Sequence, residues 1–345
     1  MLTNSQLAEL LAREAEAKSG ILSRAYRRAA RSAFLWPEEA TDLISEHRSL
    51  TELRAIGPFI SKRILRWIDK PPVKKTRPPA IRRDFIALAD ARVLLAKNPQ
   101  WSKNVRGDLQ MHSRYSDGSG TIAEMAEAAR ARHYEYIAIT DHSKGLKIAG
   151  GIDEKRLSKQ ATEIGRINKS QPGLMVLASI ELNLNPRGEG DMDPKALAKL
   201  DVVLGSFHSV LRVKHDQTKR YLAALRNPDI QILGHPRGRI YNYRLGLKAD
   251  WSRVFAEAAK LDKAVEIDCY PDRQDLNLSL LKLARREGTR ISLGTDAHRP
   301  WQLEFIELGL AAALKAKIPA GRIINFLALD EFRKWVARVR TRGRR

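Results

Sequence analysis

The chain has 345 residues and a formal net charge of +22, from 62 lysine and arginine residues against 40 aspartate and glutamate residues. This length allows one large domain and a small additional one. The charge is far from the near-neutral balance of a typical small-metabolite enzyme, so it indicates a polyanionic partner, either nucleic acid or anionic lipid. Cys269 is the single cysteine. A disulfide within the chain and a thiolate zinc cluster are therefore excluded, and any metal site must use nitrogen and oxygen ligands.

No stretch reaches the roughly 18 uninterrupted apolar residues of a membrane span. The first 20 residues are polar and amphipathic, unlike a signal peptide. We therefore expect a cytoplasmic, nucleoid-associated protein with no membrane partner and no dinucleotide cofactor. The oligomeric state stays open.

Residues 1–70 are rich in alanine, leucine and arginine, which predicts a small all-α domain. Within them, residues 50–64 have the pattern of a helix-hairpin-helix, with Gly57 in the turn and Ala55 where a first glycine is common. Such hairpins bind backbone phosphates through turn amides and helix N-termini, independently of base sequence. From position 54 to 83 there are ten cations and one acid, Asp69, which favours a polyanion site. The candidate DNA contacts are Gly57, Lys62, Arg63 and Arg66.

Residues 71–100 read as a proline-rich basic linker followed by a connecting helix. From 101 to 335, apolar strand-like runs alternate with helical segments, which is typical of crossover units in a parallel sheet. The expected strands are 108–112, 136–140, 174–178, 202–204, 230–233, 264–267 and 291–293. About seven such strands predict an α/β barrel of the TIM type. Residues 336–345 are expected to be a basic tail, because positions 332 to 345 carry seven cations and no acid.

Most of these strands end within a few residues of a histidine or a carboxylate. The potential ligands are His112, Asp117, His142, Glu181, His208, His235, Asp296 and His298. A single histidine after a strand is more often structural than metal-binding, but the shared location favours a common site. His47, His133 and His215 do not share it, and we interpret them as structural or surface residues.

All strand ends of a barrel face one side, so these ligands are expected to meet at one rim. Nitrogen and oxygen ligands suit zinc, manganese or iron(II), and a set of this size can hold two or three ions. Several ions together serve attack on a phosphate ester, because one activates water while another neutralises phosphoryl oxygens. Glu181 is the candidate for a carboxylate that bridges two ions.

Five short motifs, 108–112, 116–118, 140–142, 234–236 and 294–298, together resemble the polymerase and histidinol phosphatase (PHP) family. The resemblance implies a distorted (β/α)7 barrel with a trinuclear metal centre, in which Glu181, Asp296 and His298 act in catalysis through bound metal. It implies three ligand sets: His112, Glu181 and Asp296; Glu181, His208 and His235; and Asp117, His142 and His298. Gln110 stands where many members have histidine, so it would be a weak ligand. Lys144, Lys147, Arg187 and Arg237 lie just beyond motif residues and are candidates for phosphate binding.

The order of hairpin and barrel is similar to that of bacterial family X DNA polymerases, with a difference. Roughly forty residues separate the two parts here, fewer than a polymerase palm domain needs. In members of that family with lyase activity a hairpin lysine forms a Schiff base, and this chain has Arg63 at the corresponding position. Guanidinium is no amine nucleophile, which leaves only the neighbouring Lys62 for such chemistry.

These features predict a metal-dependent phosphoesterase that acts on DNA. The resemblance implies a 3′-5′ exonuclease or a nuclease that processes 3′ ends or abasic sites in DNA repair. Two alternatives remain open: a small-molecule phosphatase of the histidinol phosphatase kind, and a DNA-binding module with an inactive barrel. The first does not account for the charge, and the second does not account for a nearly complete ligand set.

Overall fold

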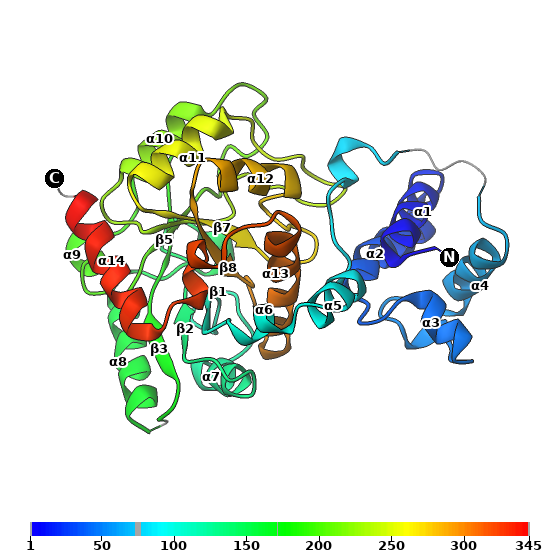
Figure 1. Cartoon of the computed structure of the whole chain (residues 1–345), viewed down its shortest axis with the longest axis horizontal. Coiled ribbons are helices and arrows are strands. Elements are labelled where there is room, and N and C mark those ends of the chain that lie inside the picture. Colours follow the sequence, from blue (N-terminus) through cyan, green and yellow to red (C-terminus); the bar gives the residue numbers. More distant parts are fainter. Residues whose placement is uncertain (1, 73–76, 171, 344–345) are drawn as a thin grey trace.

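The computed structural model describes residues 2–72, 77–170 and 172–343. Its first four helices form a group beside the larger α/β part of the molecule (Figure 1). They are α1 (Asn4–Glu16), α2 (Gly20–Ser32), α3 (Ala40–Ser45) and α4 (Pro58–Asp69). We call residues 2–72 the helical segment. Leu7, Leu11, Tyr26 and Trp36 are buried in its own apolar core, so this part of the chain is helical, as predicted.

The predicted hairpin differs from its expected form in one respect. Its first element is a three-residue 3-10 turn, Leu50–Glu52, and only the second element is an α-helix, α4. Gly57 caps α4 and Pro58 occupies its first position, where the fixed φ of proline suits a helix start. Ala55 has a φ of 65°. The turn therefore keeps the left-handed conformation that glycine usually supplies.

The connection to the α/β part contains a 3-10 turn, Ala80–Arg82, followed by α5 (Leu88–Ala96) and α6 (Pro99–Lys103). Residues 73–76 of the predicted linker lie outside the described residues. Leu88 and Ala91 of α5 pack against α13 (Ile306–Lys315). The connecting helix therefore lies along one side of the α/β part and leads into its first strand.

The remaining residues alternate between strands and helices, as predicted. The strands are β1 (Gly107–Met111), β2 (Tyr136–Ile139), β3 (Met175–Ala178), β4 (Glu181–Asn183), β5 (Leu204–Ser206), β6 (Ile232–Leu233), β7 (Ala264–Asp268) and β8 (Arg290–Gly294). The other helices are α7 (Ile122–Arg130), α8 (Glu154–Ser170), α9 (Pro194–Leu197), α10 (Thr218–Arg226), α11 (Trp251–Lys260), α12 (Leu278–Arg286) and α14 (Leu329–Gly343).

The strands pair in parallel in two sheets, β1-β2-β3 and β4-β5-β6-β7-β8. The expected count of seven is one too low, because β4 begins three residues after β3 and reads in the sequence as its continuation. Backbone hydrogen bonds also join the sheets where they meet. His112 donates to the carbonyl of Ala297 beyond β8 at 2.8 Å, and Ser143 beyond β2 donates to that of Glu181 at 3.1 Å.

The expected basic tail at 336–345 is wrong for the residues that the structure describes. They belong to α14, which continues to Gly343. Val336 and Val339 are buried with Phe332 and Trp335 against residues near the amino ends of the strands, such as Leu204. These apolar residues recur every three to four positions and so form one face of the helix, although many arginines lie between them. This face covers the end of the α/β part opposite the predicted ligands.

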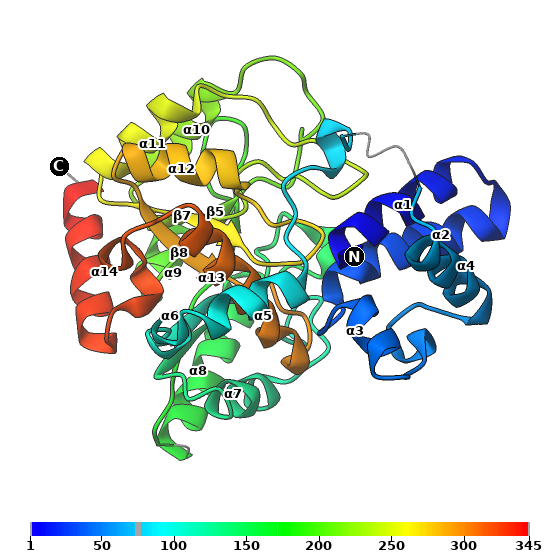
Figure 2. The ribbon, with the colours of Figure 1, turned by 45° about the vertical axis from the view of Figure 1, so that its right-hand side comes forward.

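The helical segment contacts the loops that follow β6, β7 and β8. Tyr241 lies in its apolar core, Asp272 pairs with Arg31, and Arg54 stacks over the Trp301 ring at 5.1 Å. Figure 2 shows the helical segment beside these loops. The helical segment therefore borders the carboxyl ends of the parallel strands. No helix among residues 2–72, 77–170 and 172–343 is long and apolar enough to cross a membrane.

Candidate metal centre

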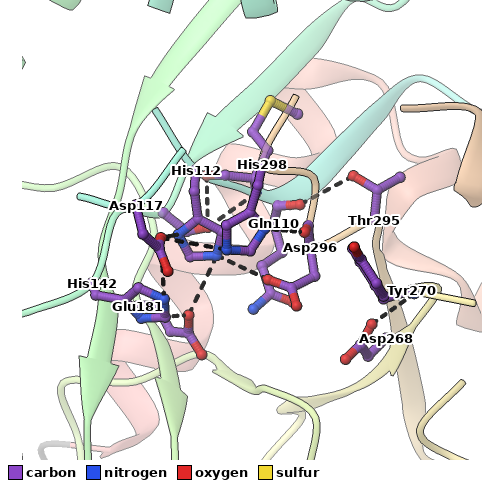
Figure 3. Close-up of polar contacts among 12 residues, drawn as sticks. Gln110, His112, Asp117, His142, Glu181, Asp268, Tyr270, Thr295, Asp296 and His298 are labelled. Carbon is purple, nitrogen blue, oxygen red and sulfur yellow. Dashed lines mark hydrogen bonds and ion pairs between the residues drawn. The ribbon is translucent and has the colours of Figure 1, made fainter. Parts of the chain in front are cut away.

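The eight predicted ligands converge beyond the carboxyl ends of the strands. Residues from the loops after β1, β2, β5, β6 and β8 join Glu181, which is the first residue of β4. Figure 3 shows His112, His142, Glu181 and Asp296 pointing toward one another. His112 and Glu181 are fully buried. The chain thus concentrates imidazoles and carboxylates in one place, where each would be costly to bury alone.

Glu181 lies at the middle of the cluster. Its Oε1 is 2.6 Å from His235 Nε2 and 3.1 Å from His208 Nε2. Its Oε2 is 3.0 Å from His142 Nδ1 and 3.5 Å from His112 Nε2. One carboxylate is therefore shared between two pairs of imidazoles, which is the geometry that a bridging ligand needs.

Three groups of ligand atoms lie close enough to surround an ion. They are His112, Asp117, His142 and His298; His142, Glu181 and His208; and His112, Glu181 and Asp296. The third equals one of the sets implied by the family resemblance, and the first adds His112 to another. The second has His142 where the resemblance has His235, although His235 contacts the same carboxylate oxygen of Glu181 as His208 does.

The chemistry of the donors fits divalent metal ions. His112 Nδ1, His142 Nδ1 and Glu181 Oε2 are buried and make no well-oriented hydrogen bond to the described residues, although His142 Nδ1 and Glu181 Oε2 lie 3.0 Å apart. Buried polar atoms in native proteins almost always have a partner. Nitrogen and oxygen lone pairs that face a common point, with no thiolate among them, suit zinc, manganese or iron(II).

The two central carboxylates are ionised, as metal ligands must be. Burial raises the pKa of Glu181, but positive charge on the facing histidines outweighs burial and holds the pKa well below its ordinary value. Burial also raises the pKa of Asp296, and the neighbouring Arg273 guanidinium then lowers it well below the ordinary value. Asp117 is less buried, and its hydrogen bond to His298 contributes to a pKa of about 2.

The backbone at two of the ligands is in a conformation that few side chains adopt. His235 has a φ of 21° and Asp296 a φ of 52°. Such positions cost on the order of 1–3 kcal/mol each, and they occur often at functional sites. The strain turns both side chains toward Glu181 and His112 directly after their strands end.

Two further motif residues hold the ligand loops in place. Asp141 accepts hydrogen bonds from the backbone amides of Ser113 and Ser116 at 2.8 and 3.1 Å, and so orders the loop that carries Asp117. Asp108 accepts from the amide of Thr295 at 3.1 Å, next to Asp296. Asp141 directly precedes His142, and Asp108 begins the motif that ends at His112; these positions are the signal that could have identified them.

Gln110, the predicted weak ligand, is directed toward another partner. In the amide orientation that satisfies both groups, its nitrogen donates to the Glu266 carboxylate at 2.6 and 2.9 Å. Gly294 leaves the necessary space, because a Cβ there would lie 2.2 Å from Glu266 and 2.6 Å from Gln110. Glu266 also accepts from the His235 amide at 2.7 Å. Gln110 therefore connects β1 to β7 beneath the ligands.

Sequence reasoning missed the charged residues after β7. Arg273 forms an ion pair with Asp296 and lies 3.7 Å from Asp268, the last residue of that strand. Burial raises the pKa of Asp268 well above its ordinary value, and the charge of Asp296 raises it further. The apolar pattern of residues 264–267 indicates only a buried strand, and Arg273 lies five residues beyond the end of that strand.

The predicted phosphate contacts divide into two kinds. Lys144 pairs with Glu154 at 2.7 Å, Arg187 pairs with Glu189 at 2.9 Å, and Lys147 is exposed. Arg237 makes no ion pair among the described residues, and its Nε is buried without a partner. Arg237 thus remains the candidate best placed to receive an anion.

The predicted DNA contacts lie on or next to α4. Gly57, Lys62 and Arg66 are exposed. Arg63 instead forms an ion pair with Glu14 at 2.5 Å and lies over the Trp67 ring at 5.3 Å. The exposed cations therefore border the hairpin turn, while Arg63 helps to hold α4 against α1.

The chain matches the model of the PHP domain over residues 108–270. It is 31% identical to a probable phosphatase of Photobacterium profundum over 188 residues, which are 52% of this chain and 72% of that protein. The chain belongs to the PHP family. As a member it is a metal-dependent hydrolase, which confirms the resemblance seen in its motifs.

A second relative is named as a DNA enzyme. It is the DNA polymerase/3′-5′ exonuclease PolX of Bacillus subtilis, 36% identical over 235 residues that cover 68% of this chain and 41% of that protein. The chain thus spans about two fifths of the length of this relative. Among solved structures, a histidinol phosphate phosphatase from Lactococcus lactis, complexed with zinc, L-histidinol and phosphate, covers 61% of this chain and 94% of its own. The TM-score is 0.44 and the identity 17%.

Proposed function

We propose that this protein is a DNA-processing phosphoesterase that hydrolyses phosphoester bonds at 3′ ends, as a 3′-5′ exonuclease or as a nuclease acting on blocked or abasic ends. One observation carries the proposal: the loops after β6, β7 and β8, which hold or adjoin metal ligands, are also the loops that contact the helical segment. Tyr241 and Trp301 belong to two of these loops. A basic hairpin is thereby attached beside the rim where the ligands converge.

We further propose that the two parallel sheets act as one distorted barrel, with residues 1–70 as a DNA-binding domain and residues 101–335 as the catalytic domain. The hydrogen bonds from His112 to Ala297 and from Ser143 to Glu181 support a continuous ring of strands. The separate apolar core around Leu11 and Trp36 supports a distinct helical unit.

Two or three divalent ions, held by the eight ligands, would supply an activated water and positive charge for the phosphoryl oxygens. Glu181 would be shared between ions, and Asp296 and His298 would complete the set. Asp141 would orient the loop that carries Asp117, and Gln110 would connect β1 to β7 beneath the ligands. The PolX relative, whose name includes a 3′-5′ exonuclease, favours DNA as the substrate.

A small-molecule phosphatase is the second candidate, because several relatives are named probable phosphatases. The net charge of +22 and the attached basic hairpin weigh against it. An inactive barrel is the third. It is disfavoured because every predicted histidine and carboxylate ligand has reached the same cluster.

The direct test offers the protein with Mn²⁺ three substrates: 3′-labelled DNA, a duplex with an abasic site, and histidinol phosphate. We expect cleavage of one or both DNA substrates and little release of phosphate from histidinol phosphate. Asp296→Ala with His298→Ala should abolish cleavage, whereas His215→Ala, which changes an exposed histidine outside the cluster, should not. Cleavage of histidinol phosphate alone would show that the small-molecule reading is right.

The role of the hairpin is tested separately with Lys62→Gln and Arg66→Gln combined. Each lost phosphate contact should weaken DNA binding and lower the slope of log affinity against log salt by about 1. Fluorescence anisotropy on a labelled duplex measures both. An affinity and slope equal to those of the unchanged protein would contradict a DNA contact at α4.

A further inference from the structure

A pocket lined by five arginines lies between the segment that leads out of the helical segment and the loop after β6. Its volume is about 230 Å³, below the 300–1,000 Å³ of sites for drug-sized ligands. Two of the arginines come from the connecting segment and three from the loop. They are Arg77, Arg83, Arg237, Arg239 and Arg244. We call this set the arginine pocket.

The positive charge of the arginine pocket is only partly offset by the chain. The buried carboxyl group of Asp275 faces Arg237 and Arg239, and burial raises its pKa. None of its five guanidinium groups forms an ion pair with a carboxylate within residues 2–72, 77–170 and 172–343. Asp84 is the one acidic residue in its lining, and that side chain accepts a hydrogen bond from Asn277 at 3.3 Å. Five cations that the protein compensates only in part attract an anion from outside.

Arg239 is the most deeply buried arginine of the pocket, with 4% of its surface exposed. Its guanidinium lies 3.8 Å over the ring of Phe85, and it donates to the carbonyls of Arg273 at 2.8 Å and Asp84 at 2.9 Å. Burial lowers its pKa to about 10, so it keeps its charge at neutral pH. A buried cation without an ion pair is costly to keep charged, and an added anion would lower that cost.

Arg237 supplies an unused hydrogen-bond donor. Its Nη2 donates to the carbonyl of Leu245 at 2.9 Å, while its Nε is buried without a partner. Arg244 is tied to the same loop through the carbonyl of Gly238. The loop therefore fixes the guanidinium groups in place before any ligand arrives, and charge-assisted bonds to phosphate oxygens are strong when their donors are already oriented.

The pocket adjoins the metal centre along two paths. Arg237 is two residues beyond the ligand His235, so their Cα atoms are at most about 7 Å apart. Arg239 donates to the carbonyl of Arg273, whose side chain pairs with the ligand Asp296. On its other side, Phe85 packs against Tyr241, which lies in the core of the helical segment. The pocket thus lies between the metal centre and the helical segment.

We propose that the arginine pocket binds a backbone phosphate of the same DNA strand whose end reaches the metal centre. This inference rests on the proposed function. It adds that the enzyme recognises a phosphodiester next to the reacting one, so that a polynucleotide is preferred over a compound with a single phosphate. The hairpin then holds DNA farther from the end, and the pocket fixes the position of the end.

The test variant combines Arg83→Gln with Arg244→Gln. Both guanidiniums donate through Nε to backbone carbonyls, those of Pro78 and Gly238, and glutamine can still donate there. Arg239 is left intact because it supports the loop itself. Arg130→Gln with Arg338→Gln is the matched control, since it removes two charges from α7 and α14. Thermal unfolding should show that both variants remain folded.

Three measurements are made on the full chain. They are anisotropy of a labelled oligonucleotide without metal, Mn²⁺-dependent cleavage of that oligonucleotide, and Mn²⁺-dependent hydrolysis of bis(p-nitrophenyl) phosphate, which has no second phosphate. We expect the test variant to lose about tenfold in oligonucleotide affinity and about 2 in the salt slope. Hydrolysis of the small diester should change by less than about twofold.

A neutral methylphosphonate, placed at one linkage at a time near the 3′ end, locates the contact. One position should weaken binding of the unchanged protein but not of the test variant. Equal affinity, salt slope and cleavage for variant and unchanged protein would overturn the proposal, as would equal losses in the matched control. If no DNA is cleaved at all, the proposed function fails, while loss of binding in the test variant alone would still support a polynucleotide phosphate in the pocket.

Discussion

The metal centre and the arginine pocket lie next to each other and treat charge in opposite ways. At the centre, Glu181 is surrounded by imidazoles, and each ligand contacts a partner of complementary chemistry. In the pocket, five guanidiniums gather with one carboxylate among them. In the loop after β6 only Pro236 separates His235 of one environment from Arg237 of the other.

The difference shows what each region lacks. The centre gathers imidazole nitrogens and carboxylate oxygens, and His112 Nδ1 among them has no hydrogen bond to the described residues; it therefore suits cations. The pocket has an excess of positive charge and, at Arg237 Nε, a buried donor without an acceptor among the described residues. It therefore suits an anion. A phosphate chain bound across both would meet metal at its reacting end and guanidinium beyond it.

The largest expected effect comes from Glu181→Gln, which should break the centre and leave the pocket intact. Glutamine keeps the volume but removes the charge that faces four histidines, so metal binding and catalysis fail together. We expect hydrolysis to fall by about 10³-fold or more, with metal content reduced. Oligonucleotide binding without metal should stay within about twofold.

Metal analysis, rate measurements and anisotropy on the same preparation check this prediction. His215→Ala is the control. A Glu181→Gln protein that retains a tenth of the activity with its metal bound would show that this carboxylate is not shared between ions.

That the eight candidate ligands lie together could be predicted from the sequence, because nearly all of them follow strands and the carboxyl ends of parallel strands lie at one end of a sheet. The pocket could not be predicted in the same way. Arg83 and Arg244 are 161 positions apart, and their proximity depends on how the connecting segment packs against the loop after β6. Arginines are abundant throughout the chain, so Arg237 could be proposed only from its place beside a motif.

Other differences have similar causes. Gln110 was expected to face a metal, but the partner that turns it away, Glu266, comes from the distant strand β7. The end of α14 was interpreted as part of a basic tail because the seven cations of positions 332–345 were more conspicuous than Phe332, Trp335 and Val339 on the buried face of this helix. For both Gln110 and α14 the local composition was interpreted correctly. The long-range contacts that determine their roles cannot be seen in the sequence alone.

Tyr241→Ala should break the connection between the helical segment and the rim. The Tyr241 ring packs edge-on against Phe34 at 4.9 Å and Phe85 at 5.2 Å, and only 2% of the residue is exposed. Loss of a large buried aromatic ring costs about 3–5 kcal/mol. We expect early unfolding of the helical segment and faster proteolysis between the two parts of the chain.

Tyr243→Ala is the matched control two residues away, because Tyr243 is 59% exposed. Urea unfolding and limited proteolysis compare the two variants. Similar stability for both would mean that the helical segment does not depend on Tyr241 for its attachment, and the placement of the pocket between the two parts would need another support.

Gln110→Met tests whether this residue serves the metals or the fold. Methionine has a similar length but no donor, so Glu266 would lose the side-chain donor beneath the ligands and keep only the His235 amide. An unsatisfied buried group costs about 1–3 kcal/mol. We expect the metal-free protein to lose this stability in urea, while metal affinity falls by less than about tenfold. The reverse result, a large loss of metal affinity with unchanged stability of the metal-free protein, would restore Gln110 as a ligand.

The smallest expected effect is stabilisation of the folded protein by inorganic phosphate, which should bind the arginine pocket but not the metal-free centre. In EDTA, which removes divalent metals, inorganic phosphate can still bind guanidinium groups, and a ligand present at its dissociation constant stabilises the folded state by about 0.4 kcal/mol. Increasing phosphate should therefore raise the melting temperature of the unchanged protein slightly at constant ionic strength. The Arg83→Gln, Arg244→Gln variant should show no such rise, whereas Glu181→Gln should show all of it, because its arginine pocket is unaltered. An equal rise in all three proteins would place the phosphate elsewhere on this basic surface and would remove the contrast between the two regions.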